Sequence, residues 1–116
     1  MKKPGQVVLT RFPKTNLGRG KVRPAILIAR SPSVYDDWLT CMITSKIGQY
    51  IESFDELIDE ASSDFDASGL RIGCVVRVAR VAVISESALI GALGEIEPQR
   101  LTRIKQNLAR WIQAAS

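Results

Sequence analysis

The sequence predicts a small β-rich α+β fold, in which five or six short strands form a barrel or roll and one helix ends the chain. Three observations support this prediction. Short apolar, β-branched segments alternate with turn-forming residues up to residue 84. Helical periodicity is clearest after Pro98. A chain of 116 residues has room for one hydrophobic core, so residues 1–116 are expected to form a single domain.

Three strands are expected in the first half of the chain. Residues 6–12 begin with apolar, β-branched side chains and form the first strand. Residues 13–22 are rich in Gly, Lys and Arg, which predicts a basic hairpin loop. Residues 24–29 are apolar on both faces, so they predict a central, doubly buried strand that begins at Pro24. Residues 38–44 form the third strand after a turn-rich connection.

The second half of the chain is expected to continue the sheet after an acidic segment. Residues 54–60 are expected to form one or two helical turns, and Ser68 begins a turn with the glycine that follows it. Residues 71–84 carry valine at five positions, which predicts either two strands or one bent strand. Gly94 and Pro98 then lie on either side of the approach to the terminal helix.

The C-terminal segment has the clearest periodic pattern. Its apolar residues recur at helical spacing and form a single stripe: Leu101, Ile104, Leu108, Trp111 and Ile112. Pro98 suits the first turn of a helix, and Glu97 before it complements the positive helix N-terminus. Trp111, like Trp38, sits in an apolar pattern, so we expect both indoles in the core or at a dimer interface rather than stacked on bases.

Charge is distributed unevenly along the chain. Seven of the twelve acidic residues lie within residues 52–66, a stretch that contains no Lys or Arg. The remaining sixteen basic and five acidic residues give 16 − 5 = +11. A basic body suits a polyanionic ligand or an acidic protein partner, although solvated surfaces explain the charges equally well. We suggest, as a hypothesis, that the acidic segment covers part of a basic groove.

Several function classes are not expected from this sequence. It contains no run of 18 apolar residues, so no membrane association is expected, and its N-terminal segment lacks the pattern of a secretory signal. We therefore expect a cytoplasmic protein. It has no histidine, and the spacing of Cys41 and Cys74 matches no zinc site, so we expect neither a metal nor a cofactor. The two cysteines are expected to be buried free thiols, with a cross-strand disulfide as the alternative.

Three motifs, in order along the chain, resemble the MazF/PemK family of type II toxins. The first two are an apolar opening strand that leads to Phe12-Pro13, and a basic-Arg-Pro-Ala-apolar run at residues 21–28. The third is an apolar-Thr-Ser strand end at residues 43–45. Residues 69–77 and 93–94 add weaker similarity. The ordered set, rather than any single motif, makes the resemblance specific.

The resemblance implies an SH3-like barrel of the CcdB/MazF/PemK type, assembled as a homodimer. It also implies an endoribonuclease that cleaves single-stranded RNA at short sequence motifs, without a metal. Members of this family use the 2′-hydroxyl of the RNA as the nucleophile and leave a 2′,3′-cyclic phosphate. Their usual partner is an acidic antitoxin protein whose tail lies across the RNA groove.

By position in these motifs, the resemblance implies catalytic roles for Arg23, Thr44 and Arg77. A guanidinium can form two parallel hydrogen bonds to a phosphate and stays charged, so charge stabilisation is its natural role. Thr44 could donate a hydroxyl hydrogen bond to the same phosphate. Strand parity would place Arg80 on the face opposite to Arg77. Further RNA-binding candidates are basic or hydroxyl side chains near these motifs: Lys14, Arg19, Lys21, Ser45 and Lys46.

The sequence also departs from the family pattern at the groups that move protons. Gln6 stands where many members have an acid, Ala79 stands where others have an Asp, and no loop histidine is present. No side chain with a pKa near neutrality is therefore an obvious general base. The alternative function is a non-catalytic binding module of the same fold. It would be a decayed toxin, or a growth inhibitor that poisons a protein target, as the gyrase-directed relatives do, through helix residues such as Trp111.

Overall fold

The structure is a computed structural model and describes residues 2–11 and 22–115. The predicted basic loop lies almost entirely outside these residues. The described strands are β1 (Gln6–Arg11), β2 (Val22–Arg30), β3 (Asp37–Thr44), β4 (Glu56–Ile58), β5 (Cys74–Ser85) and β6 (Leu89–Glu95). The described helices are α1 (Phe65–Ser68), α2 (Pro98–Ala114) and the short 3-10 turns η1 (Ile47–Gln49) and η2 (Glu86–Ala88).

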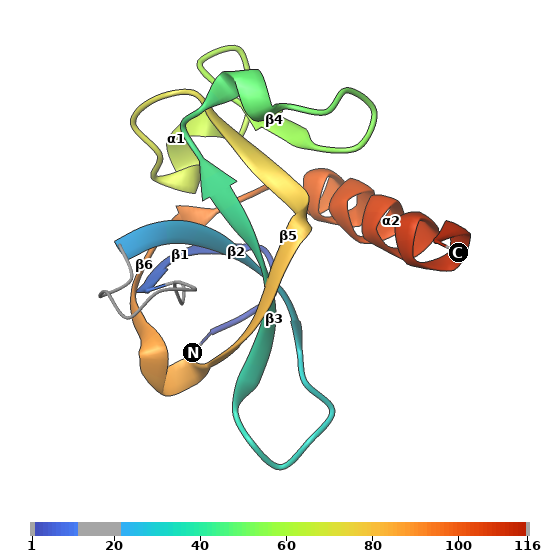
Figure 1. The fold of residues 1–116 in the computed structure, drawn as a ribbon. Coiled ribbons are helices and arrows are strands. Elements are labelled where there is room, and N and C mark those ends of the chain that lie inside the picture. The colour runs from blue at the N-terminus through green and yellow to red at the C-terminus, as the bar shows by residue number, and fades with distance from the viewer. Residues whose placement is uncertain (1, 12–21, 116) are drawn as a thin grey trace, which may run out of the picture.

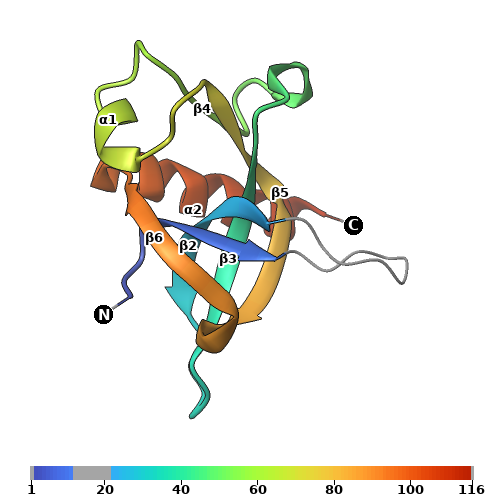
Figure 2. The same ribbon diagram turned by 90° about the vertical axis from the view of Figure 1, so that its left-hand side faces the viewer.

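The six strands form one antiparallel sheet in the order β4-β5-β3-β2-β1-β6. The sheet curls strongly, and α2 lies along one side of it (Figures 1 and 2). This arrangement confirms the β-rich, barrel-like class with a C-terminal helix. The sheet is not closed, because β4 and β6 are its two edges in the described part of the chain.

The main core lies between the concave sheet and α2. Alternate residues of the strands point into it, as the period-2 patterns predict. Its fully or nearly buried members are Val7, Ile26, Ile28, Cys41, Ile43, Ile58, Cys74, Val76, Val78, Ile96, Ile104 and Leu108. A second cluster on the other face of the first strands contains Val8, Ala25, Leu27 and Trp38, so β2 is buried on both faces, as expected.

Only the first part of the α2 apolar stripe reaches this core. Ile104 and Leu108 are buried, whereas Trp111 is 44% exposed and Ile112 is 61% exposed. Of the two expected places for Trp111, the core is therefore excluded, and the dimer interface stays a prediction. Its ring packs edge-on against Phe54 with centroids 6.3 Å apart. The last turns of α2 extend past the sheet and leave an apolar end in solvent (Figure 1).

The predicted helical turns at residues 54–60 are wrong. Residues 56–58 form β4, which pairs with residues 74–76 of β5. The Asp55 carboxylate fixes this arrangement by accepting hydrogen bonds from the backbone N–H of Ile51 and of Val78, each 3.0 Å long. A local helical pattern is thus overridden by pairing with a strand about twenty residues away.

The acidic segment contacts α2 through carboxylates that pair with arginines of that helix. That it covers part of a basic groove stays a prediction. The buried Arg100 side chain donates to Asp64 at 2.8 Å and to Glu56 at 3.0 Å. Arg103 donates to the same Glu56 at 2.9 Å. Burial alone would raise the pKa of Asp64, but hydrogen bonds from Arg100 and from the Glu97 backbone N–H outweigh burial and lower that pKa. These carboxylates hold the segment against the helix.

Strand β6 was not predicted as a separate strand. It pairs with β1 through two register shifts, and its two glycines and the lack of any fully buried residue weaken the strand pattern. Gly94 and Gly69 allow the close packing of α1 on this strand, because a Cβ at either position would clash with backbone across the contact. Gly69 also adopts a left-handed conformation, with φ of 76°, at the end of α1. None of the described helices has the length and hydropathy that crossing a membrane requires.

Candidate active site

The beginning of β2, the end of β3 and the middle of β5 surround a basic hollow beside η1. Its volume is about 240 Å³. Four of its lining side chains are cationic, and the other three are a threonine, a methionine and a glutamine. The full set is Arg23, Met42, Thr44, Lys46, Gln49, Arg77 and Arg80. The name "basic hollow" is used for this set below.

Arg23 and Thr44 reach the hollow from adjacent strands. Ala25 pairs with Met42, and the same register continued by two residues places Arg23 opposite Thr44. Side chains at opposed positions of antiparallel strands share a face. Thr44 is 6% exposed, and its hydroxyl oxygen accepts a hydrogen bond of 3.2 Å from the Lys46 backbone N–H. The hydroxyl hydrogen can still be donated to a ligand.

Arg77 lies on the same face, across β3 from Arg23. It pairs with Met42 in the β3–β5 register. Its Nη1 donates a hydrogen bond of 3.1 Å to Oε1 of Gln49, the last residue of η1. The partner is therefore a neutral amide and not one of the acidic residues, so Arg77 keeps its full positive charge facing the hollow.

Arg80 also lines the hollow, which corrects the prediction from strand parity. Cys41 pairs with Val81, but Met42 pairs with Arg77, so three residues of β5 bulge out between two successive pairs. A bulge resets the alternation of faces. In a regular strand Arg80 would share a face with the buried Val78, and an unpaired guanidinium would be costly there. That conflict is a signal in the sequence from which the bulge could have been predicted.

The basic hollow has an unbalanced charge. Four of its seven lining residues are cationic. None of the lining residues is a carboxylate, and none of the ion pairs in the described part of the chain involves one of these four cations. Cations that lie close together without a counter-charge repel one another, and a bound anionic ligand would reduce this repulsion.

An apolar hollow of about 370 Å³ adjoins the basic one. Arg23 and Thr44 line both hollows, so they lie where the two meet. The rest of its lining is mainly apolar, with Leu9, Ile43, Leu70, Ile72, Cys74 and Leu93, and it includes Ser45 and Arg71. Ser45, expected at the site, therefore borders the apolar side, whereas Lys46 borders the basic side. Lys14, Arg19 and Lys21 lie outside the described residues.

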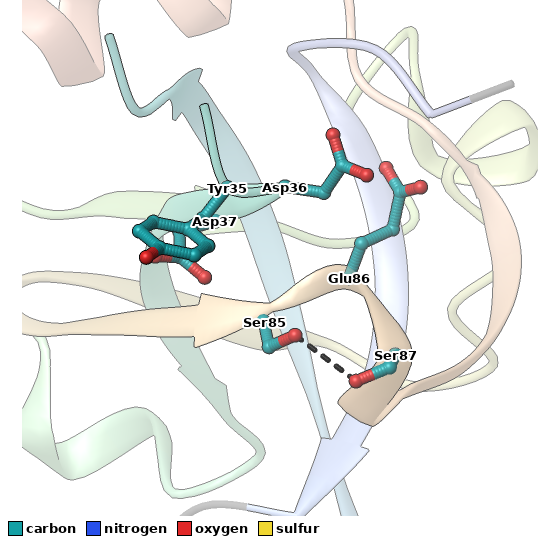
Figure 3. Close-up of a pocket in the computed structure, with 6 residues that line it drawn as sticks. All are labelled: Tyr35, Asp36, Asp37, Ser85, Glu86 and Ser87. Carbon is teal, nitrogen blue, oxygen red and sulfur yellow. Dashed lines mark hydrogen bonds between the residues drawn. The ribbon is translucent and has the colours of Figure 1, made fainter. Parts of the chain in front are cut away.

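A third hollow, at the far end of the β3–β5 pair, is acidic (Figure 3). Several of its side chains are already paired: the Ser85 and Ser87 hydroxyls lie 3.0 Å apart, and Asp36 and Glu86 both accept hydrogen bonds from the neighbouring Arg30. A hydrogen bond from the Trp38 indole, together with Arg30, lowers the pKa of Glu86. We interpret this hollow as a structural ion-pair cluster.

The thiols and carboxylates offer no second reactive centre. Both cysteines are free and buried, as expected. Burial, together with the nearby charge of Asp55, raises the pKa of Cys41 to about 12, so this thiol stays protonated and unreactive. Within residues 2–11 and 22–115, no three His, Cys, Asp or Glu side chains gather as metal ligands would.

Comparisons with known proteins agree with the motifs and the fold. The family model described as "PemK-like, MazF-like toxin of type II toxin-antitoxin system" matches residues 3–112. The Mycobacterium tuberculosis toxin MazF-mt6 is 14% identical, with a TM-score of 0.68 over 93% of this chain and 96% of its own. A mycobacterial endoribonuclease, solved in complex with its cognate antitoxin, is 15% identical, with a TM-score of 0.67 over 100% of this chain and 99% of its own. No curated protein matches this sequence significantly.

Proposed function

This chain belongs to the family of PemK-like, MazF-like toxins of type II toxin–antitoxin systems, and on that premise we propose that it is a metal-independent endoribonuclease of single-stranded RNA. One observation supports this most: Arg23 and Thr44 line the same hollow, beside two further arginines and a lysine. A guanidinium and a hydroxyl that line the same hollow can both donate hydrogen bonds to one phosphodiester, and its negative charge strengthens those bonds.

The reaction proposed is attack of the RNA 2′-oxygen on the adjacent phosphorus. A 2′-oxygen–phosphorus bond forms, the bond to the 5′-oxygen breaks, and the products are a 2′,3′-cyclic phosphate and a 5′-hydroxyl. Negative charge grows on the phosphoryl oxygens, where Arg23 and Arg77 would stabilise it and Thr44 would donate a hydrogen bond. In the described part of the chain no carboxylate lines the hollow, and the sequence has no histidine. The 2′-hydroxyl proton therefore passes to water, and a water molecule supplies the proton that the departing 5′-oxygen takes up.

The predicted partners are single-stranded RNA, an acidic antitoxin and a second copy of the chain, acting in the cytoplasm as one domain. The four uncompensated cations of the basic hollow support a polyanionic or acidic occupant. A structural neighbour was solved with its cognate antitoxin. An antitoxin whose acidic tail occupies the basic hollow would exclude RNA by competing for the same cations.

The proposal is tested by incubating the purified chain with single-stranded RNA in EDTA. We expect cleavage that leaves cyclic phosphate ends, and no cleavage of fully 2′-O-methylated RNA, which has no free nucleophile. Arg23→Ala is expected to lose roughly 10²–10³-fold in rate, the usual cost of removing one oxyanion donor. Lys105→Ala removes the same charge from an exposed position on α2 and is expected to leave the rate unchanged.

A second candidate function is the non-catalytic binding module. The exposed Trp111 and Ile112 favour it, because apolar groups gathered in solvent often mark a protein contact. It predicts that wild-type protein leaves RNA intact and that Trp111→Ala, rather than Arg23→Ala, relieves growth inhibition in cells. Cleavage by the wild type that disappears in Arg23→Ala would exclude this candidate.

A further inference from the structure

The bulge in β5 gives the basic hollow a cation that a regular strand would not place there. Val78, Ala79 and Arg80 have no partners on β3 between the pairs Met42–Arg77 and Cys41–Val81. Val78 stays in the core, whereas Arg80 is exposed and lines the hollow. Arg80 forms no ion pair within the described part of the chain. Its charge is therefore available to a ligand.

One phosphodiester cannot balance the charge around the hollow. The scissile phosphate carries a single negative charge, whereas Arg23, Lys46, Arg77 and Arg80 carry four positive ones. Binding one phosphate would leave a net positive charge among side chains that share a small volume, and that charge is best balanced by further phosphates. The charge count thus favours a binding site for more than one phosphate.

The positions of the cations separate them into two groups. Arg23 and Thr44 lie at the junction of the two hollows, whereas Lys46, Arg77 and Arg80 line only the basic one. Arg23 is on β2 and Arg80 is on β5, with β3 between them. Adjacent strands lie about 4.8 Å apart, so the two backbones are separated by roughly 10 Å. On β5, Arg77 pairs with Met42, two residues from Thr44, whereas Arg80 lies three residues further along the strand. Arg80 is therefore the arginine of β5 placed to reach a different phosphate from the one at Arg23 and Thr44.

We propose that Arg80 binds a phosphate that neighbours the scissile one, and so positions the RNA strand across the basic hollow. This inference rests on the proposed function, which supplies the RNA and the scissile position. Arg80 is a positioning residue: it holds the strand in register while Arg23, Thr44 and Arg77 act on the reacting phosphate. Removing its charge should weaken binding of the strand and leave the reacting groups in place.

The salt dependence of binding measures how many phosphates the protein contacts. Wild type and variants are titrated with a fully 2′-O-methylated RNA oligonucleotide, which binds without being cut, at several salt concentrations. Each lost phosphate contact reduces the slope of log K against log salt by about 0.7 for a single strand. Arg80→Ala is expected to reduce the slope by about 0.7 and the affinity roughly tenfold, with Arg80→Lys retaining the slope. Lys105→Ala is the charge-matched control and should keep the wild-type slope.

A methylphosphonate scan identifies the phosphate that Arg80 contacts. Each phosphate of a cleavable substrate is replaced in turn by a neutral methylphosphonate, and kcat/KM is measured for wild type and Arg80→Ala. One neutral position is expected to lower the wild-type value while leaving Arg80→Ala unchanged, because the contact is already lost. We expect that position to be next to the scissile phosphate, and coupling to the scissile phosphate itself, or to none, would overturn the inference. Thermal unfolding checks that Arg80→Ala folds, and Arg80→Gln serves as a second neutral variant.

The two levels of the proposal fail in different ways. If the wild type neither binds nor cuts RNA, the proposed function is wrong. If the wild type cuts RNA and Arg23→Ala abolishes cutting, but Arg80→Ala keeps the full salt slope and shows no coupling, then only the role of Arg80 is wrong.

Discussion

Arginines in this protein serve two different purposes, which a count of charges along the chain does not distinguish. Arg100 is 7% exposed and donates to two carboxylates and to the backbone carbonyl of Leu57, so its charge is compensated inside the protein. Arg23 and Arg80 have no carboxylate partner in the described part of the chain, so their charge is available at the surface. Burial and partners, rather than residue type, decide which arginines can bind a ligand.

The pairing of Asp64 with Arg100 predicts a pH-dependent contribution to stability. The folded-state pKa of Asp64 lies below its ordinary value of 3.8, so the stabilisation is complete above that pH and is lost as the pH falls through the folded value. Asp64→Asn is expected to lower the free energy of unfolding by about 3 kcal/mol at pH 7, because it leaves a buried guanidinium with one charged partner fewer. Urea unfolding at pH 7 and at pH 3 measures the difference, which should shrink at the lower pH.

Asp66→Asn is the matched control for this prediction. Asp66 is an exposed carboxylate within α1, two residues after Asp64, which is the N-cap residue of that helix. Its neutralisation is expected to change the free energy of unfolding by less than about 0.5 kcal/mol. Equal effects of the two substitutions at pH 7 would mean that the buried pair contributes no more than a surface charge.

At the scale of elements, short segments with weak local signals complete the sheet. Strand β4 has three residues and β6 contains two glycines, yet each pairs along its length with a neighbouring strand. Helix α1 has four residues and packs on β6 through backbone contact at Gly69 and Gly94. These segments are stabilised by tertiary packing, since four-residue helices and three-residue strands do not persist alone.

The contact between α1 and β6 predicts opposite outcomes for two glycines of one strand. A Cβ at Gly94 would lie closer to the Ala67 carbonyl oxygen than real Cβ atoms approach, whereas nothing lies within 4 Å of a Cβ at Gly91. Gly94→Ala is expected to lower the free energy of unfolding by about 2 kcal/mol, as overpacking does. Gly91→Ala is expected to be neutral or slightly stabilising, because alanine reduces the freedom of the unfolded chain. Thermal or urea unfolding compares the two, and a tolerated Gly94→Ala would argue against this packing.

At the scale of the whole molecule, the basic and apolar surfaces lie on different parts of the fold. The basic hollow lies between the beginning of β2, the end of β3 and the middle of β5. The exposed apolar residues Trp111 and Ile112 lie at the C-terminal end of α2, which projects beside the sheet (Figure 1). Substrate binding and association with a second copy can therefore use separate surfaces. Variants that change one surface should leave the other intact.

The projecting end of α2 predicts how the proposed homodimer forms. Light scattering at micromolar concentration is expected to give about 26 kDa, twice the 12.8 kDa of one chain. Ile112→Lys, which places a charge on this exposed apolar end, is expected to weaken the dimer at least tenfold. Val34→Lys makes the same change at a loop residue that is 93% exposed and should not affect association. A monomeric wild type would contradict the dimer, and a dimer unchanged by Ile112→Lys would place its interface elsewhere.

Local pattern alone determined the elements whose signals are strong and self-contained. The doubly apolar run of β2, the valine-rich β5 and the amphipathic α2 were all predicted from residue spacing, because each buries side chains at the period of its own backbone. The order of the motifs by itself also indicates the family. Motif positions likewise selected Arg23 and Thr44, which the fold brings to one hollow.

Only the tertiary structure decided the rest, because it depends on contacts between residues far apart in the chain. The Asp55 carboxylate accepts a hydrogen bond from the Val78 backbone N–H, 23 positions away, and Asp64 accepts one from Arg100, 36 positions away. Because of such contacts, part of the acidic segment forms strand β4 and part of it is held against α2. The three bulged residues of β5 can be recognised only from its pairing with β3, and the bulge places Arg80 on the same face as Arg77. Residue spacing reports the period of one segment, whereas register between strands is set by how both segments pack.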